Sequence, residues 1–426
     1  MSDPTPNSRG TRHNSTRRST ERTTQHRPSV VLVGLDSLQG LQVARLFSDR
    51  EIPVIGVAKN REYYSCRTRV CESILYTNTA TTALIDTLEE LAEELEVKAV
   101  LIACQDKNVL VISEHRDRLQ DAYHIVLPDH DVVNKLIDKS QFAEFASEIG
   151  LRIPKTMVIR GESDAREAAA SLMYPCVIKP NYRSSEWSKH TKTKAIEVSD
   201  PEELLEACRH MSGWVEALVA QERIKGPDDL NYTCNAYFDR DSNPLVTFVS
   251  RKIRQWPPGL GQGSSSQEVE NEDVVDATLR LFKAAGLRGF GYLETKRDPD
   301  TGDYYAIEPN IGRPTGRSAM AEGGNVDLHY TAYMDALGLP LPENRSQSGT
   351  GVKWFHELRD IQAAAHYWRR GELTIGDWLA SLRGKRVYAI FSWRDPKPFF
   401  AALRRALPVL LSPRERGRED YRAVAE

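Results

Sequence analysis

Short apolar runs alternate with amphipathic stretches through the first third of the chain. The apolar runs are brief and rich in β-branched residues, which is typical of buried strands. They lie at residues 30–34, 52–57, 97–103 and 125–127. Between them, residues 38–48 and 82–95 carry apolar side chains at helical spacing. Alternating strands and helices imply a parallel sheet covered on both faces, so residues 29–134 are expected to form a Rossmann-like domain.

From residue 135 to residue 338 the pattern becomes that of an α+β domain with antiparallel strands. A helix is expected to open at Asp138 and to end at Gly150. Strands are expected to begin at 152–156, to fill 174–180 and 218–222, and to continue at 231–238 and 245–254. A polar loop covers 181–194, and the glycine- and serine-rich stretch 258–266 is either a flexible substrate loop or a linker.

The most informative pattern in this region is a hairpin that carries two glutamates. Apolar alternation on both sides of Pro299 and Gly302 predicts strand, turn and strand. If the turn centres near residue 301, Glu294 and Glu308 are direct cross-strand partners, with Cβ atoms roughly 4.5–5.5 Å apart. Asn310 lies two residues on and therefore on the same face. Three oxygen ligands, two of them anionic, suit Mg²⁺, whereas a hairpin slipped by one residue would leave both glutamates in solvent.

Beyond residue 338 the pattern predicts a small C-terminal α/β extension, residues 339–426. A linker at 340–351 precedes expected helices at 356–370 and 374–382 and a strand at 386–392. Residues 399–407 form an amphipathic basic helix. Packing of this helix on the body of the protein is favoured, and peripheral contact with an anionic membrane is the alternative.

Composition narrows the functional classes. The chain has 426 residues, of which 40% are apolar and 27% charged, and no apolar run approaches the length of a membrane span. A net charge of −3 gives no general attraction to nucleic acid, so no nucleic-acid partner is expected. The six cysteines are scattered without a Cys-x-x-Cys pair, which favours reduced thiols and a cytoplasmic location. Residues 1–28 are basic and almost free of apolar side chains, which predicts a disordered tail rather than a secretory signal.

The first domain gives only weak indications of a ligand. The turn from Gly34 to Gly40 follows the first strand but lacks the Gly-x-Gly-x-x-Gly spacing of a dinucleotide site. Gln105 and Asp106 follow a later strand, where such a sheet can bind a small molecule at its switch point.

The order of these sequence features along residues 30–338 resembles that of the ATP-grasp superfamily. The resemblance is closest to its carboxylate-amine ligase branch, to which D-aspartate ligases are similar. The resemblance implies a two-lobed ATP-grasp domain over residues 135–338, after a Rossmann-like domain. It also implies that Lys139 and Lys179 contact nucleotide phosphates, and that Glu222 accepts a hydrogen bond from the adenine amino group. The implied nucleotide site further contains Gln221, Asp229, Asn231 and the backbone of Arg223 and Ile224. Glu294, Glu308 and Asn310 would hold Mg²⁺, with Mn²⁺ as the alternative ion.

Basic residues near the hairpin are candidates for the substrate side. Arg251 and Lys252 follow one antiparallel strand, and Arg313 follows the metal residues closely. A planar guanidinium pairs bidentately with a carboxylate or a transferring phosphoryl group, so Arg313 is the strongest candidate for catalysis. Arg254 and Arg317 are further candidates.

The sequence departs from the resemblance in one loop. Many relatives close over the phosphates with a glycine-rich loop, but the stretch 182–190 has no glycine. Ser184 and Ser185 could still donate to phosphate. Trp187 either caps the site or packs beneath the loop.

These observations predict an ATP- and Mg²⁺-dependent ligase that activates a small carboxylate, expected to be an amino acid, as an acyl phosphate and joins it to an amine. Phosphorylation is needed because a carboxylate is a poor electrophile at neutral pH. The alternative from another class is a nucleotide-binding regulatory protein without ligase activity, and a dehydrogenase that uses the first sheet is a third, poorly supported reading. A homodimer is an open alternative to a monomer.

Overall fold

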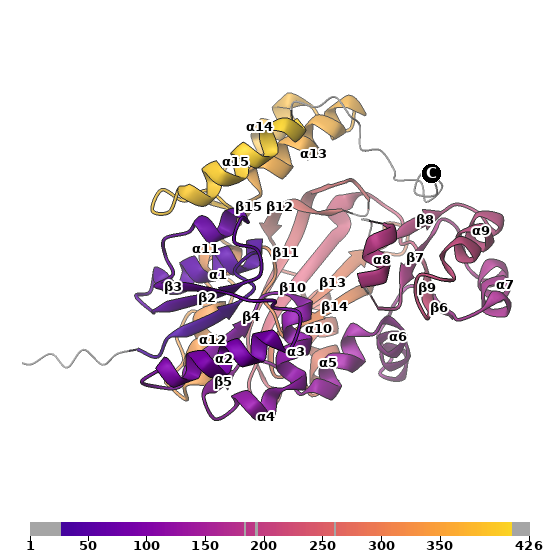
Figure 1. The fold of residues 1–426 in the computed structure, drawn as a ribbon. Coiled ribbons are helices and arrows are strands. Elements are labelled where there is room, and N and C mark those ends of the chain that lie inside the picture. The colour runs from indigo at the N-terminus through magenta and orange to yellow at the C-terminus, as the bar shows by residue number, and fades with distance from the viewer. Residues whose placement is uncertain (1–26, 183–184, 192–194, 260, 411–426) are drawn as a thin grey trace, which may run out of the picture.

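The computed structural model describes residues 27–182, 185–191, 195–259 and 261–410 and contains a five-stranded, a seven-stranded and a four-stranded sheet (Figure 1). The basic tail expected over residues 1–28 lies almost wholly outside the described residues, as does Ser184. Among the helices of the described part, none is both long and apolar enough to cross a membrane.

The first sheet is parallel throughout, in the order β3-β2-β1-β4-β5, which confirms the predicted Rossmann-like arrangement. Its strands are β1 Val30–Val33, β2 Val54–Ala58, β3 Ser73–Tyr76, β4 Ala99–Ala103 and β5 Tyr123–Ile125. Its helices are α1 Leu38–Ser48, α2 Ala83–Glu94, α3 Asp106–Glu114 and α4 Arg116–Leu119, with the 3₁₀ turn η1 Tyr64–Arg67. The pattern missed β3, because this edge strand is half exposed and has no run of buried apolar side chains. The strand expected at 125–127 lies two residues earlier, as β5.

The four-stranded sheet forms a separate lobe at the right of Figure 1, in the order β6-β9-β7-β8. Its strands are antiparallel: β6 Thr156–Ile159, β7 Cys176–Pro180, β8 Ile196–Val198 and β9 Leu218–Glu222. Helices α7 Glu162–Ser171, α8 Ser185–His190 and α9 Pro201–Met211 belong to this lobe, while α5 His130–Ile137 and α6 Lys139–Glu148 lead into it. The expected polar loop at 181–194 thus contains a helix. Trp187 in α8 is fully buried against Trp214, so it packs in the core of the lobe and does not cap a site.

The seven-stranded sheet has the order β14-β13-β10-β11-β12-β15-β16. Its strands are β10 Asn231–Phe238, β11 Pro244–Trp256, β12 Gln262–Glu268, β13 Gly289–Arg297, β14 Tyr304–Ile311, β15 Lys353–Phe355 and β16 Arg386–Tyr388. The associated helices are η2 Asp228–Leu230, α10 Glu272–Ala284, α11 Ala319–Gly323 and α12 Leu328–Ala336. The prediction of a flexible loop at 258–266 is wrong for the second half of this stretch, because β12 pairs with β11 on one side and β15 on the other.

The C-terminal segment continues this sheet. β15 and β16 lie at its edge, and α13 Glu357–Arg369, α14 Ile375–Ser381 and α15 Lys397–Leu410 lie across the top of Figure 1. Ala402 of α15 is buried, and Phe399 and Leu403 pack against the core that includes the first domain. The favoured expectation for this helix, packing on the body, is therefore confirmed. The proposed domain boundary at residue 339 stays a prediction.

The two faces of the seven-stranded sheet pack against different parts of the protein. On β10, Ala236 and Phe238 pack on the side of α10, whereas Tyr237 packs with the core shared with β1 and α1. Because side chains alternate along a strand, Thr233 and Asn235 lie on the same face as Tyr237, and both are buried. A polar patch is thus enclosed between the sheet and the first domain, where buried polar groups are costly unless they have partners.

A buried ion pair fixes the C-terminal segment to this sheet. Arg254 donates to both carboxylate oxygens of Asp360 in α13, at 2.9 and 2.8 Å, and both residues are about 95% buried or more. This pairing makes Arg254 a structural residue rather than a substrate ligand.

We predict that Arg254→Met lowers the apparent free energy of unfolding by about 3–5 kcal/mol, because Asp360 would remain buried without a counter-charge. Denaturant unfolding measures the change. The double variant Arg254→Met/Asp360→Leu should lose less than the single variant, since no isolated charge remains. Arg166→Met is the control, because its ion pair with Glu162 is solvent-exposed and should contribute little to stability. Equal losses in the single and double variants would contradict this account.

Candidate functional site

The β13–β14 hairpin places Glu294 and Glu308 directly opposite each other, which confirms the predicted pairing. The pairing depends on an irregularity in the ladder. Nearer the turn, Thr295 pairs with Ala306, and Ile307 is an extra residue that shifts the register by one. Without this bulge Glu308 would lie out of step with Glu294, on the other face of the strand.

The surroundings of the two carboxylates fit an oxygen-liganded cation. Glu294 lies 3.6 Å from the ammonium group of Lys252, while Glu308 is exposed and has no hydrogen bond or ion pair within the described part of the chain. Asn310 accepts a hydrogen bond from Arg313 through its Oδ1 atom, at 2.7 Å. No group of three or more His, Cys, Asp or Glu side chains with metal-binding geometry occurs among the described residues, so the predicted set depends on the amide oxygen of Asn310. Two carboxylates and one amide oxygen are hard ligands of the kind that Mg²⁺ accepts.

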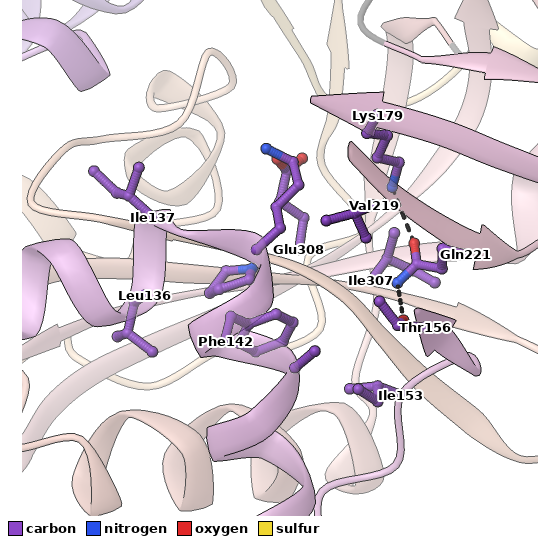
Figure 2. A pocket seen from close by; sticks show the side chains of 13 residues that line it. Leu136, Ile137, Phe142, Ile153, Thr156, Lys179, Val219, Gln221, Ile307 and Glu308 are labelled. Carbon is purple, nitrogen blue, oxygen red and sulfur yellow. Dashed lines mark hydrogen bonds between the residues drawn. The ribbon is translucent and has the colours of Figure 1, made fainter. Parts of the chain in front are cut away.

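A pocket of about 460 Å³, which includes solvent at its mouth, lies beside these carboxylates (Figure 2). It brings together four predicted site residues, Lys139, Lys179, Gln221 and Glu308, from different elements. Apolar side chains of α5, α6, β9 and β14 complete the lining. They include Leu136, Ile137, Phe142, Val219 and Ile307. A pocket with an apolar lining and a few convergent charged groups suits a nucleotide, whose base is flat and whose phosphates are anionic.

The two lysines are held by their neighbours. Lys179 donates to Gln221 Oε1 at 3.0 Å, and Gln221 Nε2 donates in turn to Thr156 Oγ1 at 3.0 Å. Lys139 is the first residue of α6 and contacts the carbonyl oxygen of Asn181 at 3.4 Å. The helix N-terminus and the lysine at that position both favour a negatively charged group.

The structure does not bring Glu222 into this pocket. Gln221 and Val219 of β9 line the pocket, and Glu222 alternates to the opposite face, where its carboxylate accepts a hydrogen bond from the Met173 amide at 2.9 Å. The contact of its carboxylate with adenine therefore stays a prediction without support from this arrangement. The backbone is better placed for that role, because the N–H of Ile224 has no hydrogen-bond partner within the described residues, whereas that of Arg223 makes a long bond of 3.3 Å to Pro175.

Arg313 joins the hairpin to the first domain. Its guanidinium ion-pairs with Asp106 at the start of α3 and donates to the Tyr292 hydroxyl and to Asn310, at 2.6 and 2.7 Å. Burial opposes the charge, but Tyr292 and Asp106 outweigh it, and the pKa of Arg313 lies above its ordinary value. Burial also raises the pKa of Tyr292 to about 12, so its hydroxyl stays protonated at neutral pH. Arg313 is thus a fixed cation beside a predicted metal ligand.

The other predicted residues lie along η2, β10 and β11. Lys252 is buried, contacts Glu294 and donates to Gln255 at 3.1 Å. Arg251 pairs with Asp229 at 3.6 Å, and Asn231 donates to the carbonyl oxygen of Asp228. Lys252 is therefore close to the facing carboxylates, whereas the contacts of Arg251 and Asn231 are with the η2 turn.

Sequence reasoning missed several residues of this region. Thr156 orients Gln221, Tyr292 supports Arg313, and Thr233 is the direct partner of Glu294 on β10. A signal for Thr233 was present in the sequence, because polar residues alternate with apolar ones along β10 in a strand at the centre of the sheet. Tyr292 and Thr156 gave no such signal, since their roles depend on contacts distant in sequence.

Two curated relatives are similar to parts of the chain. A D-aspartate ligase of Enterococcus faecium is 25% identical over 249 residues, which cover 55% of this chain and 59% of the relative. A D-alanine–D-alanine ligase B of Pseudomonas putida is 22% identical over 187 residues, which cover 41% of this chain and 54% of that protein. The chain therefore spans somewhat over half the length of these relatives. No protein-family model matches the chain.

Solved structures share the fold. An ADP complex of the N5-carboxyaminoimidazole ribonucleotide synthetase PurK has a TM-score of 0.59 and 12% identity, and the match covers 75% of this chain and 79% of that one. An L-amino acid ligase from Bacillus licheniformis has a TM-score of 0.56 and 16% identity, with 74% and 75% covered. A biotin carboxylase domain of Hydrogenobacter thermophilus with MgADP gives 0.58 and 15%, with 74% and 71% covered. These solved structures confirm the fold class, and the two ligases named above are relatives of the kind that the predicted resemblance implies.

We predict that Glu308→Gln leaves the fold intact but lowers Mg²⁺-dependent ATP turnover by about 10²-fold, because a metal at the phosphates would lose one anionic ligand. Phosphate release measured against Mg²⁺ concentration checks this. Thermal unfolding should stay unchanged or rise slightly, since the facing charges no longer repel. Glu93→Gln, on an exposed position of α2, is the matched control. Wild-type turnover by Glu308→Gln at saturating Mg²⁺ would remove this residue from the site.

Proposed function

We propose that the chain is an ATP- and Mg²⁺-dependent carboxylate–amine ligase. The observation that carries the proposal is the pair Glu294 and Glu308, in register across a hairpin at the edge of a pocket that also contains Lys139 and Lys179. A site with two lysines and two facing carboxylates can hold a triphosphate together with a cation. The relatives named above as ligases of D-aspartate and of D-alanine support an amino acid as the acid.

In this proposal the pocket binds ATP with its base against the apolar lining and its phosphates toward the lysines. Lys139 and Lys179 neutralise negative charge that would otherwise repel an incoming carboxylate. Gln221 holds the Lys179 ammonium in place, because its Oε1 accepts from Lys179 while Thr156 fixes the amide. Mg²⁺ bound by Glu294, Glu308 and Asn310 would screen the phosphate charge and act as a Lewis acid.

The proposed reaction has two chemical steps. A carboxylate oxygen of the acid attacks the γ-phosphorus of ATP, which forms an acyl phosphate and releases ADP. The nitrogen of the amine then attacks the acyl carbon, phosphate leaves, and the amine proton is lost to solvent or a base. Placing both reactants beside fixed cations accounts for the acceleration without any covalent bond to the protein.

Arg313 is suited to stabilise charge that develops during the first step. Its three contacts fix the planar guanidinium beside Asn310, so no reorganisation is needed when charge develops. Lysine lacks the fork needed to contact Asp106, Tyr292 and Asn310 together. The position thus requires arginine rather than a positive charge alone.

We predict that Arg313→Lys and Arg313→Ala lower turnover by about 10²-fold while changing ATP affinity much less, because the lost contact is made mainly in the transition state. ATP affinity from binding measurements and turnover from steady-state rates, measured separately, check this difference. Arg240→Ala is the control, since Arg240 lies on the surface with 88% of its side chain exposed.

The acyl phosphate itself can be tested with hydroxylamine, which should trap the activated acid as a hydroxamate only when ATP and the correct acid are present. Release of ADP without any trapped acyl group across a panel of acids, together with full activity of Arg313→Ala, would instead favour a nucleotide-binding regulator or a plain ATPase.

A further inference from the structure

Two guanidinium groups approach Gly263 of β12 without a carboxylate beside either of them. Arg317 follows β14, is 8% exposed, and donates through Nη2 to Thr233 Oγ1 at 2.8 Å. Arg359 comes from α13 in the C-terminal segment and donates through Nη1 to the Gly263 carbonyl oxygen at 3.3 Å. Neither arginine has an ion pair within the described residues, and the Arg317 Nε atom is buried without a hydrogen-bond partner there.

The missing side chain of Gly263 lets these groups approach the β12 backbone closely. A Cβ atom on this residue would lie 3.1 Å from Arg317 Nη1, 3.6 Å from Ser266 Oγ and 3.9 Å from Lys252 Cγ, so its three nearest neighbours are side-chain atoms and Arg317 would have to shift to accommodate it. Ser266 is fully buried, and its hydroxyl has no partner among the described residues. The cluster thus contains two hydrogen-bond donors, Arg317 Nε and Ser266 Oγ, that lack an acceptor among the described residues.

The nearby carboxylates are engaged elsewhere. Asp360 is paired with Arg254, Glu294 lies beside Lys252, and Glu357 accepts from the backbone amides of Ile390 and Phe391. Burial and the charge of Arg359 lower the pKa of His356 to about 3, so this imidazole is neutral. The two arginines thus leave an uncompensated positive charge, which is costly in a partly dry site unless an anion binds there.

Gly263 lies three strands from Glu294 in the sheet, with β11 and β10 between them, but the side chains of Arg317 and Lys252 cross this interval. Thr233, which accepts from Arg317, is the direct cross-strand partner of Glu294, and Lys252 contacts Glu294 from the next strand. An acid bound beside Glu294 could therefore place a second anionic group at the Arg317 guanidinium, which Thr233 holds on the Glu294 side of this interval.

We propose that Arg359 and Arg317 bind a second carboxylate of the acid substrate, one that is not phosphorylated, with Ser266 as an additional donor. The inference rests on the proposed ligase function and narrows its substrate to dicarboxylic acids. It also gives the C-terminal segment a part in the site, since α13 supplies Arg359 across the edge of β12. Bidentate pairing with carboxylate is the geometry that a guanidinium favours.

The test compares acids that differ only in this second carboxylate. Full-length protein with ATP and Mg²⁺ is assayed with aspartate against asparagine and with glutamate against glutamine, each as both enantiomers. The wild type should use at least one acid far better than its amide. Arg359→Met should raise the KM for that acid by about 10- to 100-fold, with kcat and the KM for ATP changed by less than about threefold. Arg359→Lys should recover part of the affinity.

Arg369→Met is the matched control, because Arg369 lies on the same helix, carries the same charge and is exposed. Gly263→Ala is the second variant and should raise the same KM, since its Cβ would enter the space beside Arg317. This variant tests the site even if Arg359→Met fails to fold.

A binding measurement separates this inference from the proposed function. The preferred acid, at about tenfold excess over its KM or Kd, should raise the Tm of the wild type and of Arg369→Met by about 2 °C, and that of Arg359→Met by much less. If no acid supports ATP turnover but this pattern of stabilisation appears, the ligase proposal fails and the anion site stands. Preference for the amide in the wild type, equal KM values for Arg359→Met and Arg369→Met, or no stabilisation of the wild type by any acid would overturn the inference.

Discussion

Repulsion between Glu294 and Glu308 is the constraint on which the site depends. Two carboxylates that pair directly across a hairpin repel each other unless a cation lies close to them, and the strands hold them there through the ladder between β13 and β14. A cation relieves the repulsion, and the pocket beside Glu308 supplies lysines for the anion that such a cation would accompany. The chemistry proposed for the chain follows from this arrangement.

The central sheet can hold these charged groups because its two faces differ. One face is apolar and packs on α10, whereas the other encloses Thr233, Asn235 and Lys252 between the sheet and the first domain. Arg313 crosses this enclosed layer and connects Asp106, at the carboxyl end of a strand of the parallel sheet, with Asn310 on the hairpin. The first domain therefore contributes to the candidate site, since Asp106 fixes the orientation of the arginine next to the predicted metal ligands.

The position of the C-terminal segment also depends on contacts with the central sheet. β15 extends the sheet next to β12, the Arg254–Asp360 pair holds α13 against β11, and this placement brings Arg359 to Gly263. A segment that the pattern separates from the rest by a linker thus belongs physically to the same sheet. Trp393 of this segment is exposed, whereas the next two residues, Arg394 and Asp395, contact the first domain.

The sequence by itself determined the alternating strands and helices of the first domain, the antiparallel strands of the second and the hairpin that carries Glu294 and Glu308. These features depend on local periodicity and turn residues, which are visible within about ten positions. It also identified the lysines that the structure brings to one pocket with Gln221 and Glu308. Only the tertiary structure decided the bulge at Ile307, the turn of Glu222 away from the pocket and the burial of Trp187 in a core. It alone joined Arg313 to Asp106 and Arg359 to Gly263, because these contacts link residues 207 and 96 positions apart and depend on how separate elements pack.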